Sequence, residues 1–190
     1  MNTEKEGAQN SRSSTVSPVA PLLQRVRVVL ARTQHPGNAG SAARALKTMG
    51  LSDLALVSLG RPLDYEAMAL AAGASDVLSA ALNHQTLPEA LAGCSWVIGV
   101  TARHRDLSVP FSTLRDCTRR LAAEQGGRIA FVFGAERTGL TNEELALCNE
   151  AVTIPANPEY GSLNLAAAVQ VVAYELRLAA EVDPVTVEGE

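Results

Sequence analysis

The chain has 190 residues and a formal net charge of −4 at pH 7, and 47% of its residues are apolar but only 4% aromatic. This length suits one domain with a sizeable core and short tails. The sequence has no apolar run of 18 residues and no N-terminal hydrophobic segment, which argues against membrane insertion and secretion and predicts a cytoplasmic protein.

Composition divides the chain into three parts. Residues 1–24 are rich in Ser, Asn, Gln and Pro without periodicity, so we predict a disordered N-terminal tail there. Residues 181–190 carry four acidic residues and no base, which predicts an acidic C-terminal tail. One folded domain is therefore expected over residues 25–180.

Short β-branched runs alternate with helical patterns through this domain. Strands are predicted at residues 26–31, 54–58, 95–100, 128–133 and 151–154, with a minimal strand at 76–78. Helices are predicted at residues 39–49, 64–72, 86–93, 112–125 and 142–147, with a last helix from near Ser162 to 178. The alternation predicts an α/β fold with a mostly parallel sheet and helices on both faces.

The first strand is followed by a Pro-Gly-Asn turn and a helix that ends near Gly50, a helix C-terminal glycine. Asn38 lies near the start of this helix and Arg44 in its second turn. Asn38 is either a simple helix cap or a functional side chain. Arg44 is either a solvated helical arginine or a functional one, and residue type alone leaves both alternatives open.

Three later loops fall at the carboxyl ends of strands, where open α/β sheets bind ligands. They span residues 100–103, 133–140 and 154–162, and each has small residues close to the strand end. The third holds two prolines and a glycine and runs into a helix N-terminus, so it presents backbone N–H groups. A flat ligand could therefore reach the backbone at this edge.

Common catalytic motifs are missing. There is no G-x-G-x-x-G, P-loop or G-x-S-x-G pattern, which disfavours a dinucleotide oxidoreductase and a serine hydrolase. The three histidines are scattered, so no metal site is expected, and three isolated cysteines indicate buried thiols in a reducing compartment. What remains is backbone hydrogen bonding, Glu136 and several arginines, which suits a nucleoside-like cofactor and a phosphate-bearing substrate.

One stretch of the neutral domain is locally basic. It contains only two acidic residues, Asp106 and Asp116, against five arginines. These arginines are Arg103, Arg105, Arg115, Arg119 and Arg120. The cluster is either a solvated surface or a phosphate-binding patch.

Taken together, the segments resemble the SpoU-type branch of the SPOUT RNA methyltransferases over about residues 25–180. The resemblance is carried, in order, by Asn38-x-Gly40-x-x-x-Arg44, by Phe133-Gly134-x-Glu136-x-x-Gly139-Leu140, and by Ile154-Pro155 through Ser162-Leu163-Asn164-Leu165. Further segments resemble the bacterial TrmJ-type tRNA methyltransferase subfamily, namely residues 47–51, 70–77 and 156–160. Gly161 departs from the serine expected there, a change that leaves backbone contacts possible.

The resemblance implies methyl transfer from S-adenosyl-L-methionine to a ribose 2′-hydroxyl of tRNA, at nucleotide 32 of the anticodon loop. It also implies a deep C-terminal trefoil knot, which no general packing rule proposes, and a homodimer in which Arg44 reaches the partner's site. By position, the cofactor contacts would come from Val100, Thr101, Ala102, Gly134, Ile154, Gly161, Ser162 and Leu163.

The resemblance makes Arg44, Asn38 and Ser162 the catalytic candidates. Because a guanidinium has a pKa above about 12, Arg44 suits anchoring an RNA phosphate and stabilising a developing alkoxide better than removing a proton. Asn38 and Ser162 could orient the hydroxyl or the loop, and Glu136 is expected to fix loop geometry through an arginine. The residues expected to face RNA are Arg44, Arg103, Arg105, Glu136 and Tyr160.

Two other functions stay open on the sequence. One is the same chemistry on ribosomal RNA, and the other is a cofactor-dependent RNA-binding module without catalysis. Family members of this type continue into a further helical segment, so the chain is either a truncation or a short natural form.

Overall fold

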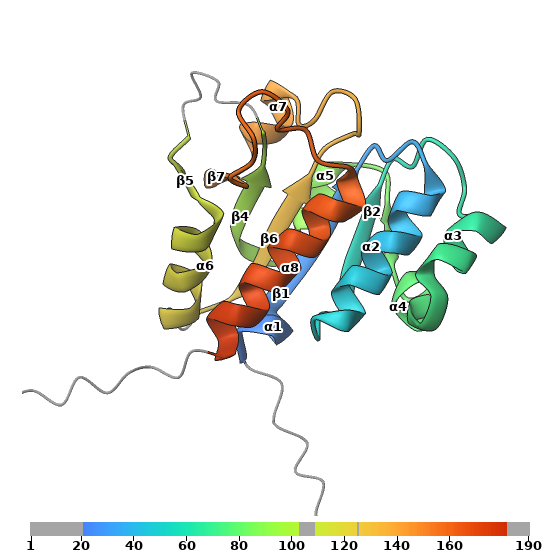
Figure 1. Ribbon diagram of the computed structural model, residues 1–190, viewed down its shortest axis with the longest axis horizontal. Helices are drawn as coiled ribbons and strands as arrows, with labels where there is room; N and C mark the ends of the chain where they lie inside the picture. Colours follow the sequence, from blue (N-terminus) through green and yellow to red (C-terminus); the bar gives the residue numbers. More distant parts are fainter. Residues whose placement is uncertain (1–20, 103–108, 125, 182–190) are drawn as a thin grey trace, which may run out of the picture.

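A seven-stranded sheet forms the centre of the molecule (Figure 1). The computed structural model describes residues 21–102, 109–124 and 126–181. The strands are β1 (Val26–Ala31), β2 (Asp53–Val57), β3 (Leu82–His84), β4 (Cys94–Val100), β5 (Phe111–Thr113), β6 (Arg128–Phe133) and β7 (Glu150–Thr153). They lie in the order β3-β2-β1-β6-β4-β7-β5, and every neighbouring pair is parallel. The predicted parallel sheet is confirmed.

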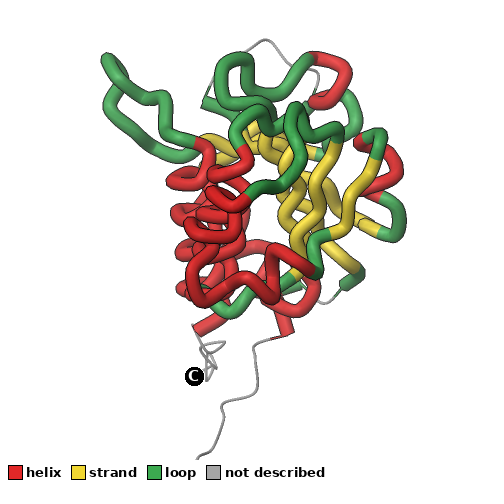
Figure 2. Tube along the Cα trace, turned by 90° about the vertical axis from the view of Figure 1, so that its right-hand side faces the viewer, coloured by secondary structure: helices red, strands yellow, loops and turns green. Residues whose placement is uncertain are grey.

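Helices cover the two faces unequally. They are α1 (Pro21–Arg25), α2 (Pro36–Thr48), α3 (Tyr65–Ala71), α4 (Ser75–Ser79), α5 (Leu87–Leu91), α6 (Leu114–Ala123), α7 (Asn142–Leu145) and α8 (Leu165–Glu181), with a 3₁₀ turn, η1, at Ala72–Ala74. The larger core joins one face to α2, α6 and α8, and these helices stack on one side of the sheet (Figure 2). The short α5 and α7 pack on the other face. Within the described ranges, no helix is long and apolar enough to cross a membrane.

The folded chain begins earlier than predicted. Residues 21–24, assigned above to a disordered tail, belong to α1, in which Leu22 and Leu23 are 5% and 2% exposed. Both side chains join the larger core, where α1 contacts α8. Burial of two leucines explains why this segment is part of the domain.

Near the sheet edges, one predicted strand is wrong and one predicted helix begins later than expected. Residues 76–78 form part of α4 rather than a strand, because Val77 and Leu78 both pack into the helix-side core. The outer strand is instead β3, which pairs with β2. At the opposite edge, the predicted helix 112–125 begins only at Leu114, because the residues before it form β5 beside β7.

The strand order brings distant connections to one edge. Phe133 at the end of β6 pairs with Leu30 of β1 on one side and with Val100 of β4 on the other. Val100 in turn pairs with Val152 of β7. Because all four strands are parallel, the connections that follow them meet at the same carboxyl edge of the sheet.

Candidate functional site

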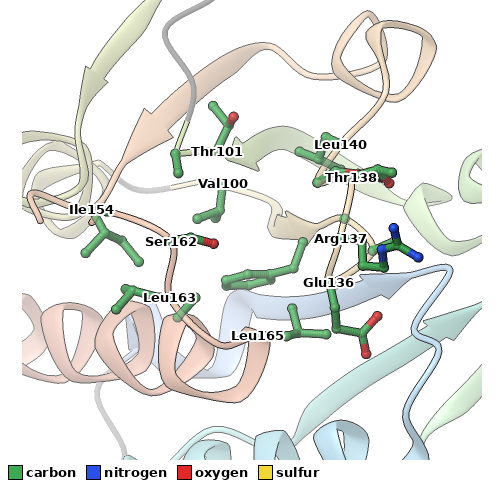
Figure 3. A pocket seen from close by; sticks show the side chains of 17 residues that line it. Val100, Thr101, Glu136, Arg137, Thr138, Leu140, Ile154, Ser162, Leu163 and Leu165 are labelled. Carbon is green, nitrogen blue, oxygen red and sulfur yellow. Dashed lines mark hydrogen bonds between the residues drawn. The ribbon is translucent and has the colours of Figure 1, made fainter. Parts of the chain in front are cut away.

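A cavity of about 140 Å³ lies at this edge, above the ends of β4, β6 and β7 (Figure 3). The structure brings all eight residues expected to contact the cofactor to its lining: Val100, Thr101, Ala102, Gly134, Ile154, Gly161, Ser162 and Leu163. Nine further residues complete the wall, and the sequence interpretation did not assign them to the cofactor: Phe133, Ala135, Glu136, Arg137, Thr138, Gly139, Leu140, Leu165 and Ala168. All of these nine except Ala168 lie within the second and third motifs, so assigning each whole motif segment to the cavity would have found them.

The loop after β6 folds back on itself and forms one wall. Gly139 N–H donates to the carbonyl of Ala135 at 2.8 Å, and Gly139 has a φ of +67°, which favours glycine. A Cβ atom at Gly134 would lie 2.1–2.3 Å from the backbone of Gly139 and Leu140. Only glycine fits at position 134 in this loop conformation. This steric requirement explains the glycine at that position of the second motif.

Glu136 fixes this loop to the connection after β1. Its carboxylate accepts hydrogen bonds from the backbone N–H groups of Gln34 (3.0 Å) and His35 (3.2 Å) and from Nδ2 of Asn38 (2.9 Å). Glu136 therefore does fix loop geometry, but its partners among the described residues are backbone and amide donors rather than the expected arginine. Burial raises the pKa of Glu136, but these donors outweigh burial and hold that pKa below its ordinary value.

Asn38 connects this network to the third motif. It is the third residue of α2, with His35 at the N-cap, so it does not cap the helix, as one alternative above supposed. Its Oδ1 accepts a hydrogen bond of 3.2 Å from Nδ2 of Asn164. Oδ1 of Asn164 accepts from the N–H groups of Ala166 and Ala167, so Asn164 caps α8. This cap explains why α8 begins at Leu165 instead of near Ser162.

The three catalytic candidates do not converge within one chain. Ser162 lines the cavity, and Figure 3 shows its hydroxyl turned toward the middle of the cavity. Asn38 is committed to Glu136 and Asn164 behind the wall. Arg44 is exposed on α2 and does not line the cavity. Gly40 of the first motif has a packing role, because a Cβ there would lie 2.0 Å from the carbonyl oxygen of Ala67 in α3.

The residues expected to face RNA are scattered. Tyr160 is 82% exposed and lies outside the lining of the cavity. Arg103 and Arg105 lie outside the described residues. Two further arginines of the basic cluster are engaged in ion pairs: Arg115 with Glu175 of α8 at 2.7 Å, and Arg120 with the buried Glu150 at 2.5 Å. Within the described ranges, no group of His, Cys, Asp and Glu side chains could hold a metal ion.

A family model described as "SpoU rRNA Methylase family" matches residues 25–174. The chain belongs to this family. The sequence is 57% identical over 160 residues to the tRNA (cytidine/uridine-2′-O-)-methyltransferase TrmJ of Escherichia coli (strain K12), and the match covers 83% of this chain. It covers 65% of that protein, so the chain spans about two thirds of the length of the curated relatives that it matches. A Klebsiella pneumoniae TrmJ matches to the same extent.

Solved structures of similar proteins have the same fold. A probable methylase family protein from Haemophilus influenzae Rd KW20 is 51% identical, with a TM-score of 0.79 and coverage of 83% of this chain and 67% of that chain. A probable methyltransferase from Bordetella pertussis Tohama I is 46% identical, with a TM-score of 0.77 and coverage of 84% and 98%. An AdoMet-bound rRNA methyltransferase from Sinorhizobium meliloti, 22% identical with a TM-score of 0.64 and coverage of 81% and 56%, shares the fold.

Proposed function

We propose that this SpoU-family chain methylates a ribose 2′-hydroxyl of tRNA, at nucleotide 32 of the anticodon loop, with S-adenosyl-L-methionine as methyl donor. The observation that carries the proposal is the 57% identity to TrmJ, a tRNA (cytidine/uridine-2′-O-)-methyltransferase, over 83% of this chain. The three motifs of the resemblance lie within residues 25–174, which the family model matches, and residues of the second and third motifs line one cavity.

The cavity fits the proposed cofactor. Phe133, Leu140 and Leu165 give it apolar surface, while the strand ends and the loop at Gly134 expose backbone hydrogen-bonding groups. A planar base recognised through its edge needs this combination. The residues that would hold the cofactor are Val100, Thr101, Ala102, Gly134, Ile154, Gly161, Ser162 and Leu163. When bound there, S-adenosyl-L-methionine supplies a methyl group on a sulfonium, which needs no metal and no covalent enzyme intermediate.

The chain's own residues then position the RNA. Ser162 can hold the 2′-hydroxyl by a hydrogen bond, since its side chain faces the cavity. Arg44 binds a phosphate of the target strand and stabilises negative charge on the 2′-oxygen as its proton leaves. Asn38 acts indirectly, because it fixes the walls on either side of the cavity. The target nucleotide must leave its base stack to reach the cavity, at a cost of a few kcal/mol.

A homodimer completes this site. Arg44 is exposed and absent from its own chain's cavity, so the proposed role needs the cavity of a second copy. The neighbouring α8 exposes Tyr174 (49%) and Leu178 (37%), apolar side chains that a second subunit could cover. The resemblance further implies a deep trefoil knot formed by the C-terminal part. Such a knot is consistent with the position of β7 between β4 and β5 and with the packing of α8 against α2.

Mass mapping of the methylated nucleotide tests the function. Unmodified tRNA transcript is incubated with the purified chain and S-adenosyl-L-methionine, digested, and read by mass spectrometry. A methyl group on the ribose of nucleotide 32 is expected, and a transcript with a 2′-deoxynucleotide there should gain none. Methylation elsewhere in the tRNA would contradict the assigned position.

The family description names ribosomal RNA, so rRNA is the second candidate substrate. Purified tRNA and rRNA are offered separately under identical conditions. Turnover on rRNA alone would replace the proposed substrate. Tight RNA binding without turnover on either would favour the binding module without catalysis.

A further inference from the structure

Arg32 has an unusual backbone conformation beside the cavity loop. It directly follows β1, and its φ is +58°, which residues other than glycine adopt only at an energetic cost. Its N–H donates to the carbonyl of Val57 at 2.8 Å, so the turn still continues the pairing of β1 with β2. Backbone strain of this kind persists where surrounding interactions compensate for it.

The side chain of Arg32 makes those interactions. Nε and Nη2 donate to the two carboxylate oxygens of Glu144, at 2.7 and 2.8 Å, which is the bidentate geometry of a strong ion pair. Nη2 also donates to the carbonyl of Gly139 at 3.0 Å. The Glu144 side chain is only 12% exposed, so water competes weakly for the pair.

Glu144 is held from its own side as well. Its Oε2 accepts the N–H of Thr141 at 2.7 Å, and its own N–H donates to Oγ1 of Thr141, a capping box for α7. Burial raises the pKa of Glu144, but the bonds from Arg32 and Thr141 outweigh burial and hold that pKa below its ordinary value. The carboxylate is therefore charged and fixed at neutral pH.

The loop at 134–140 thus has two separate attachments. Glu136 fastens its first half to the backbone at Gln34 and His35. Arg32 fastens its second half, through Gly139 and Glu144. We propose that Arg32 is a positioning residue, which acts through Gly139 and Glu144 to hold this loop in the shape that forms the cofactor cavity. This inference rests on the proposed function for its ligand, but the attachment itself is a property of the unliganded chain.

The positive φ of Arg32 allows a variant that separates the effect of its side chain on the position of the loop from an effect on protein stability. Arg32→Gly removes the side chain and the backbone strain together, so the two effects on stability oppose each other. Glu144→Gln removes the charge but keeps the capping box, because glutamine serves equally at that position. Both variants should keep a wild-type circular dichroism spectrum and a melting temperature within a few degrees of wild type.

Hydrogen–deuterium exchange of the unliganded protein measures the attachment. The peptide covering residues 134–141 should exchange faster in Arg32→Gly and Glu144→Gln than in wild type. Arg115→Gln is the matched control, because it breaks another bidentate arginine–glutamate pair, between α6 and α8, whose residues are absent from the cavity lining. It should leave exchange of this peptide unchanged.

Calorimetric titration with S-adenosyl-L-methionine measures the consequence. Arg32→Gly and Glu144→Gln should each raise the Kd about 3- to 30-fold, the double variant no more than either single one, and Arg115→Gln not at all. With tRNA as substrate, KM for the cofactor should rise while kcat at saturating cofactor stays within about twofold. Arg32→Lys should recover part of the affinity, since it keeps one charge but not the fork.

The outcomes separate this inference from the proposed function. Unchanged exchange at residues 134–141 in both variants would refute the attachment. Faster exchange with a wild-type Kd would refute the positioning role. Failure of the wild-type chain to bind S-adenosyl-L-methionine would refute the proposed function, and exchange would still decide whether Arg32 holds the loop.

Discussion

The side-chain amide of Asn38 donates a hydrogen bond of 2.9 Å to Oε1 of Glu136, although the two residues are 98 positions apart in the chain. The oxygen of the same amide accepts from Asn164, which is 126 positions away. One side chain therefore joins the three motif segments. An amide suits this place because it donates on one side and accepts on the other.

Asn38→Asp should break this junction. The new carboxylate loses the donor to Glu136 and places a second negative charge beside it. We expect a loss of about 1–3 kcal/mol in the free energy of unfolding, from the unsatisfied acceptor and the repulsion together. Chemical denaturation measures the loss, and calorimetry should show weaker cofactor binding. Asn38→Asp with wild-type stability and affinity would mean that the junction is unimportant.

Glu136 gives the stability a defined pH dependence. Its pKa is lower in the folded chain than in the unfolded chain, so its contribution is fully present above the ordinary pKa of an unfolded glutamate. The contribution is lost as pH falls through the lower folded value. The difference in unfolding free energy between wild type and Glu136→Gln should therefore be constant near neutral pH and shrink in acid. A gap that stays the same throughout the acid range would contradict this assignment.

Gly134→Ala should abolish cofactor binding while RNA binding survives. The added Cβ meets backbone atoms of Gly139 and Leu140 at 2.1–2.3 Å, so the whole loop must move. Gly161→Ala is the graded comparison, because its Cβ would lie 3.2 Å from the carbonyl of Asn157 and needs only a small shift. Calorimetry for the cofactor and filter binding for tRNA measure the two affinities. Equal cofactor losses in both variants would argue against the loop geometry described here.

Arg44→Ala should abolish methylation of tRNA while cofactor binding survives. In the proposed homodimer, Arg44 serves the cavity of the other subunit. Mixing Arg44→Ala with Gly134→Ala, each inactive alone, should therefore restore activity, because one site in the mixed dimer has both an intact cavity and an arginine. A mixture as inactive as its components would show that Arg44 acts within its own chain or not at all.

The cysteines should differ in reactivity. Burial raises the pKa of Cys148 to about 12 and that of the fully buried Cys117 well above its ordinary value, so neither forms the reactive thiolate. Cys94 is half-buried, and burial raises its pKa less strongly. Maleimide labelling followed by peptide mapping should find Cys94 modified in the native chain and all three cysteines after denaturation. Rapid native labelling of Cys117 would contradict its burial beside Glu150.

The sequence predicts the sheet well where strands are buried on both faces. Apart from one arginine in each, the runs at Val26–Ala31 and Arg128–Phe133 are apolar because helices and connections cover each side of them. It predicts the edges poorly, since a three-residue run such as 76–78 satisfies helical and extended patterns equally. The two leucines of α1 are too few to show a period.

The candidate site, like the sheet, is predictable from the sequence only in part. Its loops are predictable because they follow strand ends, and glycines mark where the backbone folds closely. The partners within the site are not predictable. Glu136 bonds to backbone N–H groups, which no residue type reveals, and Arg32 finds Glu144 across 112 positions. Such pairings depend on the strand order, which periodicity does not encode.

The span of 126 residues between Asn38 and Asn164 has a consequence for how the protein forms. Contacts between chain segments so far apart carry a large loop-closure entropy, and proteins rich in them fold slowly. We expect α8 to dock on α2 late in folding, because this contact joins segments that are distant in the sequence. The cavity, however, has no wall at residues 161–168 until that docking is complete. Cofactor binding should therefore be the last native property to return on refolding. Its recovery would then report the rate of the final step of assembly.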